Sequence, residues 1–288
     1  MSQAAQQPIG SVVSLWRYPV KSMVGEELNA AVVDERGLLG DRAYAVLDRS
    51  DGKVASAKNL RKWPRMFDFR AGLTGPVPLG APTPPVQITL PDGCLVTSQQ
   101  ADVDQVLSRA FGREVTLQRA NQSHARAVES TYPNPWATRA EKYWPDMEGL
   151  DYRDTVTDFE LPEGTFFDRA VVHLLTTATL DRLRELYPQG RFEVRRFRPN
   201  IVVSLGDGAA GFIEYAWIGR TVRIGDEVEL GVTGPCSRCV MTTLAQGDLP
   251  KDSGILRTAA QHNQVNVGVY ASVLRDGEIH RRDAVSVR

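Results

Sequence analysis

The sequence has few cysteines and no long apolar run, and both shortages narrow the class of protein. Three cysteines, Cys94, Cys236 and Cys239, stand among 288 residues, a low and odd number for a secreted disulfide scaffold. No segment approaches the roughly 20 apolar residues that a membrane-spanning helix needs. The first nine residues contain no Lys or Arg, so they lack the charged start of a secretory signal. We therefore expect a cytoplasmic protein with no membrane partner.

A strong charge of either sign is also missing. Lys and Arg number 34 against 35 Asp and Glu, which gives a formal net charge of −1. This balance offers no electrostatic reason to expect nucleic acid as a partner. Hydrophobic residues make up 42% of the chain, as in ordinary globular proteins, so the chain can form a core without a disulfide or metal. A monomer is the default expectation.

Short strand-like segments separated by turn residues dominate the chain. In the first 120 residues, strands are predicted at 12–20, 44–47, 86–90, 94–97 and 114–119, with a helix from Val103 to Phe111 that ends at Gly112. Beyond residue 165, strands are predicted at 170–175, 201–205, 221–224, 228–232, 265–273 and 284–287. Two more helices are expected there, one capped by Thr177 and one over 255–260 capped by Asp252.

Periodicity is lost between residues 121 and 164, where Trp136 and Trp144 are isolated apolar anchors. We interpret this segment as a long connector. The predicted organisation is a β-rich N-terminal domain over 9–120, the connector over 121–164, and a second domain over 165–288. The fold class is α+β, mainly β, with a barrel-like second domain and a few helices.

The clearest chemical feature is a pair of cysteines two residues apart, Cys236 and Cys239. Structural zinc needs four ligands, and no second closely spaced pair exists. A thioredoxin-like redox pair should open a helix, but the residues that follow include β-branched Val240, Thr242 and Thr243. Two buried structural thiols remain an open alternative.

Arg238 lies between the two cysteines, and a cationic neighbour favours the thiolate that binds soft or high-valent metals. One thiolate is enough to bind a metal if the metal's other ligands belong to an organic cofactor. Lys21, Arg42 and Arg198 lie next to predicted strands and could bind the anionic part of such a cofactor. Alternatively, each of these three residues could simply be a solvated charge at the end of a strand.

Four motifs in this order and spacing resemble those of the MOSC-domain proteins of the amidoxime-reducing type, which carry a β-rich N-terminal MOSC domain. The motifs are Tyr-Pro-Val-Lys-Ser at 18–22, Gly-Asp-Arg at 40–42, Phe-Arg-Pro-Asn at 197–200 and Cys-Ser-Arg-Cys-x-x-Thr-Thr at 236–243. The resemblance runs from about residue 9 to the C-terminus. It implies a pterin-based molybdenum cofactor that lies between two domains.

The resemblance also implies roles for individual residues. Cys239 would be the molybdenum ligand and the catalytic residue, whereas Cys236 would accompany it without binding the metal. The cofactor-binding set would be Lys21, Ser22, Arg42, Thr176, Thr177, Arg198, Asn200 and Arg238. Related proteins often continue the Thr-Thr pair with Val-Asp-Pro, but this chain has Leu244, Ala245 and Gln246, which leaves any role of the acidic residue in doubt.

By resemblance, the expected activity is reduction of N-hydroxylated compounds: amidoximes, hydroxylamines and N-hydroxylated bases. The sequence has no four-cysteine cluster, so electrons should come from a separate ferredoxin-like protein or a b-type cytochrome with its flavin reductase. Three alternatives stay open. The chain could be a sulfur-transfer accessory in which Cys239 carries sulfur, a cofactor carrier or storage protein, or a β protein without a cofactor. The missing aminotransferase-like domain and the N-terminal β domain favour the reductase over the accessory.

Overall fold

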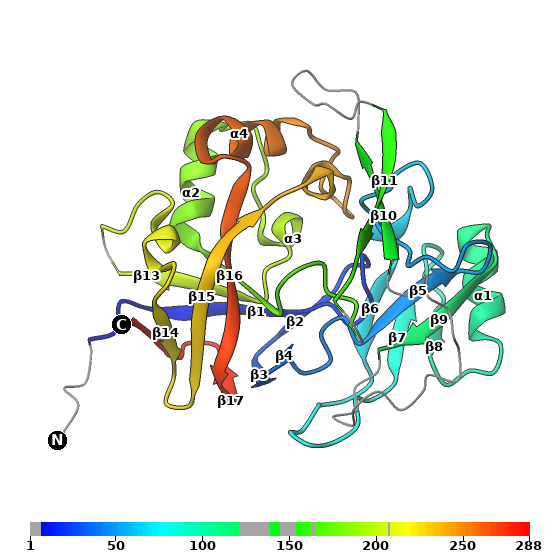
Figure 1. Ribbon diagram of the computed structural model, residues 1–288, viewed down its shortest axis with the longest axis horizontal. Helices are drawn as coiled ribbons and strands as arrows, with labels where there is room; N and C mark the ends of the chain where they lie inside the picture. The colour runs from blue at the N-terminus through cyan, green and yellow to red at the C-terminus, as the bar shows by residue number, and fades with distance from the viewer. Residues whose placement is uncertain (1–6, 121–138, 145–153, 163–164, 207) are drawn as a thin grey trace.

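The computed structural model describes residues 7–120, 139–144, 154–162, 165–206 and 208–288. Its larger lobe is a closed barrel of seven strands in the order β13-β12-β16-β15-β14-β18-β1, with β1 pairing back onto β13 (Figure 1). The described residues contain four α-helices. The prediction of a mainly β chain with a barrel and few helices is confirmed. None of the described helices is both long enough and apolar enough to span a membrane.

The barrel is built from strands at both ends of the chain. They are β1 (Gly10–Arg17), β12 (Val172–Thr176), β13 (Ile201–Leu205), β14 (Thr221–Ile224), β15 (Val228–Ser237), β16 (Asn266–Arg275) and β18 (Ala284–Val287). Alternate residues of β15, Val228, Leu230 and Val232, are buried, as expected for a strand with one face toward the core. β2 (Glu26–Leu28) extends the sheet beyond β1.

The helices of the barrel lobe lie at one end of it. The parallel pair β12 and β13 needs a crossover, which α2 (Thr177–Leu186) and α3 (Val194–Phe197) supply. α4 (Gly254–Asn263) precedes β16, and η2 (Ile213–Trp217) and η3 (Val240–Thr243) are short 3₁₀ turns. A three-stranded sheet on the lobe has the order β17-β3-β4, from β3 (Ala30–Asp34), β4 (Gly37–Leu38) and β17 (Gly277–His280).

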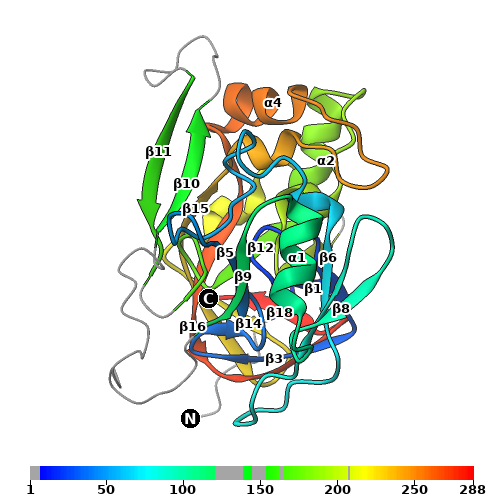
Figure 2. The ribbon, with the colours of Figure 1, turned by 90° about the vertical axis from the view of Figure 1, so that its right-hand side faces the viewer.

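The smaller lobe has its own core, which includes Val46, Phe69, Ile88 and Leu107. β5 (Tyr44–Asp48) pairs with β9 (Val115–Arg119), and β6 (Arg70–Leu73), β7 (Val86–Thr89) and β8 (Leu95–Thr97) form a second sheet. α1 (Val103–Phe111) covers these strands, and η1 (Met66–Asp68) leads into β6 (Figure 2). As predicted, α1 ends where Gly112 adopts the left-handed conformation.

Part of the segment interpreted as a connector, 121–164, forms regular structure that the sequence did not indicate. β10 (Arg139–Trp144) and β11 (Thr155–Glu160) pair as an antiparallel hairpin, and Ala140 of β10 bridges to Val54 of the smaller lobe. Most side chains of the hairpin are polar, so no apolar period marked it in the sequence. Residues 121–138, 145–153 and 163–164, Trp136 among them, lie outside the described part of the chain.

Two predicted helix caps need correction. Helix α2 is capped by Thr176, whose backbone is extended and whose Oγ1 accepts a hydrogen bond from the Thr179 amide at 3.2 Å. Thr177 is instead the first helical residue. At α4 the N-cap position is Ser253, and Asp252 accepts from the Gly254 amide at 2.8 Å.

Candidate cofactor site

Cys239 lies where the two lobes meet. It follows β15 of the barrel and directly precedes η3, and its side chain is partly exposed. Cys239 packs against the core of the smaller lobe, and Met241 of η3 is a buried member of that core. The loop after β15 therefore carries the thiol from the barrel to the opposite lobe.

Cys236 is buried at the end of β15 and is not disulfide-bonded. Burial would raise the pKa of its thiol, but the charge of Arg238 and the neighbouring His173 lower that pKa to about 6. Arg238 donates from Nη1 to the Cys236 sulfur at 2.7 Å and from Nη2 to the Phe197 carbonyl at 2.8 Å. The buried Nε of Arg238 has no hydrogen-bond partner among the described residues.

Arg42 and Arg198 lie over one buried aromatic ring, that of Tyr18. Their guanidinium carbons are 4.7 Å and 4.1 Å from the ring centroid. Both residues have positive φ angles, 48° for Arg42 and 53° for Arg198, so each arginine sits at a strained bend of the chain. Burial and the charge of Arg42 lower the pKa of Arg198 to about 10.

Lys21 belongs to a second group of charges, centred on the Asp168 carboxylate. Its ammonium donates to Asp168 at 2.5 Å and to the Phe166 carbonyl at 2.8 Å. Lys58 binds the other carboxylate oxygen of Asp168 at 2.9 Å and interacts electrostatically with Cys239. Burial lowers the pKa of Lys21 to about 8 in spite of Asp168. The Asp168 carboxylate therefore joins Lys58 to Lys21.

Ser22 and Asn200 are buried and already bonded to the protein. The Ser22 hydroxyl accepts from the Ala57 amide at 3.1 Å. The Asn200 side chain accepts from the His173 amide at 3.1 Å and donates to Asp41 at 2.9 Å. These bonds fix the chain beside Lys21 and Arg198.

Thr176 and Thr177 stand apart from the basic residues. The Thr176 hydroxyl donates to buried Glu214 at 2.7 Å, and Thr177 is partly buried at the start of α2. Within the described residues, no direct contact joins either threonine to Cys239 or to the basic cluster. Of the sequence-predicted set, the structure thus brings together Cys239, Lys21, Arg42, Arg198 and Arg238, with Ser22 and Asn200 behind them.

The sequence reasoning missed several members of the site. Lys58 and Asp168 lie in loops with no motif, and Tyr18 stands in the motif at 18–22 without an expected role of its own. Lys142, on the unpredicted hairpin, also interacts electrostatically with Cys239 and Lys58. A sequence signal existed only for Asp168, as an acid next to two aromatic residues, and it is not specific.

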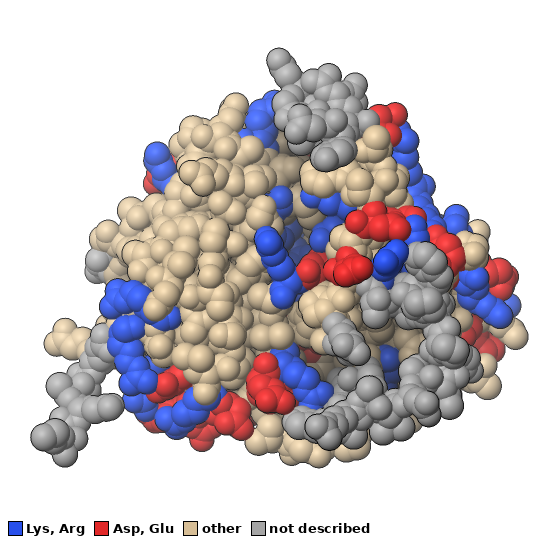
Figure 3. Space-filling view, in the orientation of Figure 1, with Lys and Arg blue, Asp and Glu red and all other residues tan. Residues whose placement is uncertain are grey.

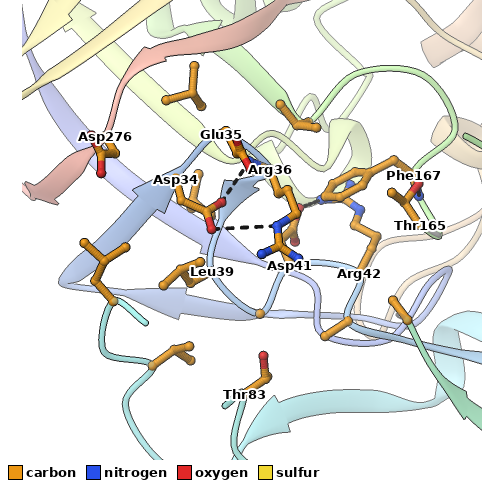
Figure 4. Close-up of a pocket in the computed structure, with 18 of the residues that line it drawn as sticks. Asp34, Glu35, Arg36, Leu39, Asp41, Arg42, Thr83, Thr165, Phe167 and Asp276 are labelled. Carbon is orange, nitrogen blue, oxygen red and sulfur yellow. Dashed lines mark hydrogen bonds and ion pairs between the residues drawn. The ribbon is translucent and has the colours of Figure 1, made fainter. Parts of the chain in front are cut away.

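The surface between the lobes is hollowed, and Lys and Arg side chains line the hollow (Figure 3). A cavity of about 870 Å³ opens beside the cluster at Arg42 and Phe167 and extends toward Asp34 and Arg36 (Figure 4). The described residues that line it include neither Cys239 nor Lys21. Of the basic residues Lys21, Arg42, Arg198 and Arg238, only Arg42 lines this cavity.

Among the described residues, no group of three His, Cys, Asp or Glu side chains is arranged to hold a metal ion. A metal bound at Cys239 would therefore have that thiolate as its single protein ligand.

Two family models match this chain. A family model for the MOSC domain matches residues 162–286, and one for the MOSC N-terminal beta barrel domain matches residues 9–126. The mouse (Mus musculus) mitochondrial amidoxime-reducing component 1 is 27% identical over 255 residues, covering 83% of this chain and 66% of that protein. The human (Homo sapiens) mitochondrial amidoxime reducing component 2 is 25% identical, covering 83% and 68%. The chain spans about two thirds of the length of these relatives.

A bovine (Bos taurus) molybdenum cofactor sulfurase is 23% identical and covers 93% of this chain but 31% of that protein. Among solved structures, the YUAD protein from Bacillus subtilis aligns over 98% of both chains with 12% identity and a TM-score of 0.47. YiiM from Geobacillus stearothermophilus covers 41% of this chain and 54% of its own, with 18% identity and a TM-score of 0.32.

Proposed function

Because the chain belongs to the MOSC-domain proteins and carries their N-terminal β-barrel domain, we propose that it is a molybdenum-cofactor-dependent oxidoreductase. Its substrates are N-hydroxylated compounds such as amidoximes and hydroxylamines, in keeping with relatives named amidoxime-reducing components. A separate electron-transfer protein supplies the electrons. The observation that carries the proposal is one partly exposed thiol, Cys239, surrounded by basic residues at the junction of the lobes.

The residues present fit an anionic cofactor. A molybdopterin carries a phosphate and a dithiolene, and both are negatively charged. Near Cys239 the ammonium groups of Lys58 and Lys142 and the guanidinium of Arg238 outnumber the Asp168 carboxylate. The unpartnered Nε of Arg238 is a buried donor that an acceptor on a ligand would satisfy.

When bound, the cofactor supplies the two-electron redox chemistry. Cys239 would be its thiolate ligand. Lys21, Arg42 and Arg198 would bind its anionic groups, because each presents a buried or half-buried cation at the junction. Asp168 fixes the positions of Lys21 and Lys58 and so preorganises their charges before any ligand arrives.

One comparison favours a second function, sulfur transfer. The relative named molybdenum cofactor sulfurase covers 93% of this chain. In that role Cys239 would carry sulfur to a cofactor held at the same basic cluster, and the protein would turn over no N-hydroxylated compound.

A turnover assay separates the two functions. Cofactor-loaded protein is supplied with a reduced dye and a simple amidoxime, and amidine formation is measured. We expect turnover by the wild-type protein, a loss of about 100-fold or more in Cys239→Ser, and no change in Cys94→Ser, which alters an exposed cysteine. Full activity of loaded Cys239→Ser would refute the role of Cys239, and an inert wild-type holoprotein would favour sulfur transfer.

A further inference from the structure

The β10–β11 hairpin brings a lysine, Lys142, to the candidate site. The hairpin stands between the two lobes in Figure 1. Lys142 is partly buried on β10, next to Tyr143, whose amide donates to the Lys58 carbonyl at 2.9 Å, so the strand runs beside the Lys58 loop. Burial lowers the pKa of Lys142, and the charges of Cys239 and Asp168 oppose that shift. A residue of the hairpin is therefore part of the electrostatic environment of the Cys239 thiol.

Lys142 differs from its basic neighbours in forming no ion pair within the part of the chain that the structure describes. Lys58 binds Asp168 at 2.9 Å, and Arg238 donates to the Cys236 sulfur and the Phe197 carbonyl. Lys142 forms no ion pair with any described residue, and its ammonium lies 3.4 Å from the centroid of the Trp144 ring. A cation held over an aromatic ring keeps its hydrogen-bond donors available to a ligand.

The hairpin is anchored by residues of β10 other than Lys142, among them buried Ala140, which packs in a core cluster with Val54 and Phe166. Side chains alternate along a strand, which places Glu141 on the other side of β10 from Lys142. Glu141 accepts from Lys53 at 2.9 Å and from Asn59 at 2.8 Å. Lys53 also binds Asp158 of β11 at 2.7 Å. This anchoring fixes the strand that presents Lys142.

We propose that Lys142 is a substrate-binding residue whose ammonium pairs with an anionic group of the substrate beside Cys239. The site then prefers N-hydroxylated compounds that carry a carboxylate to those that carry a fixed positive charge. The neighbouring cations Lys58 and Arg238 act in the same direction, since they repel a cationic substrate. This inference rests on the proposed reductase function.

The test measures binding by calorimetry, independently of turnover. The probes are a phenyl amidoxime with a para-carboxylate and the same compound with a para-trimethylammonium group. Each is titrated into oxidised, cofactor-loaded protein at one ionic strength. We expect the wild-type protein to prefer the carboxylate probe by about tenfold, the size of a single partly screened ion pair. Lys142→Gln should strongly reduce the preference, leaving only the part due to Lys58 and Arg238, and Lys142→Arg should retain it.

The matched control is Arg139→Gln, which removes one positive charge from the other face of the same strand and should leave the preference unchanged. Molybdenum and pterin contents are measured in every variant. The inference is overturned by equal affinity for the two probes, by no binding of either to wild type, by an unchanged preference in Lys142→Gln, or by cofactor loss in that variant. Binding with the expected preference but without turnover would instead count against the reductase function alone.

Discussion

Arg196 is a fully buried arginine that holds the loop presenting Cys239. Its guanidinium donates to the carbonyls of Thr242 at 3.2 Å and Leu244 at 3.1 Å, on either side of the end of η3. It also donates to the carbonyls of Arg191 and Pro250, both at 2.8 Å. One planar group with several N–H donors thus ties together three segments of the barrel lobe.

Replacing Arg196 tests this role. We expect Arg196→Met to lower the free energy of unfolding by about 3 kcal/mol or more, because it leaves several buried carbonyls without a donor. Arg196→Lys should recover only part of the loss, since a single ammonium cannot reach all four carbonyls. Urea unfolding of the cofactor-free protein measures both. If Arg196→Met were as stable as wild type, the prediction would be wrong, and water would satisfy the buried carbonyls as well as the guanidinium does.

The thiol of Cys236 should titrate near neutral pH. Its pKa is lowered to about 6, because Arg238 and His173 outweigh the effect of burial. The folded pKa lies below the unfolded value of about 8.5, so the thiolate's stabilisation is complete above that value and is lost as pH falls through about 6. The difference in absorbance at 240 nm between wild type and Cys236→Ser follows the thiolate. A difference that appears only above pH 8 would contradict the lowered pKa.

Among individual residues, the sequence predicted those site residues that belong to a motif. Lys21, Arg42, Arg198 and Cys239 were expected from four short motifs, and the structure places them around one junction. Lys58 and Lys142 could not be expected, because each reaches the junction only through the folding of a loop or hairpin that bears no motif. The local sequence around a single lysine does not show where folding places it.

Among the elements, helix α2 shows how a cap can be misplaced by one residue. Two threonines are adjacent, and both are good N-cap residues by type. The structure selects Thr176 because β12 continues through it, leaving its backbone extended and its hydroxyl beside the Thr179 amide. Thr176 also donates to Glu214, a bond that Thr177 does not make.

The two threonines form a matched pair for mutation. We expect Thr176→Ala to lower the free energy of unfolding by about 1–2 kcal/mol, through loss of the cap and of the Glu214 hydrogen bond. Thr177→Ala should change it by less than about 0.5 kcal/mol. Thermal or urea unfolding of the cofactor-free variants gives the comparison. Equal losses of unfolding free energy in both variants would show that Thr176 is not the only cap of α2.

Several strands with a clear apolar pattern were predicted with their bounds, whereas short strands such as β2, β4 and β17 and the β10–β11 hairpin were missed. The strands at 201–205, 221–224 and 284–287 have the predicted bounds because β-branched runs end at turn residues there. The β10–β11 hairpin is stabilised by contacts outside itself, such as the pairing of Ala140 with Val54 and the ion pairs of Lys53. Such stabilisation cannot be read from the hairpin's own residues.

For the whole molecule, the decisive feature is that β1 closes the barrel. It pairs with β13 on one side and with β18 on the other, although it precedes the smaller lobe in sequence. A division of the chain after residue 164 therefore separates β1 from the strands it joins. Local patterns identify strands but not their partners, so this closure was not predictable from the sequence.

The closure predicts how fragments behave. A fragment of residues 162–288 lacks β1 and would expose the edges of β13 and β18, so we expect it to aggregate or remain unfolded. Joining residues 7–17 to that fragment through a flexible linker should improve its folding, as judged by circular dichroism and gel filtration. A cooperatively folded, monomeric 162–288 fragment without β1 would contradict the prediction.

The most direct test of the account is molybdenum K-edge X-ray absorption on the purified, cofactor-loaded protein. Wild type and Cys239→Ala are compared at equal molybdenum content, with zinc counted in the same samples. The account predicts molybdenum in the wild type and one sulfur neighbour fewer around the metal in Cys239→Ala. Identical sulfur shells in the two proteins, or purified protein that holds zinc and cannot be loaded with molybdenum, would contradict it.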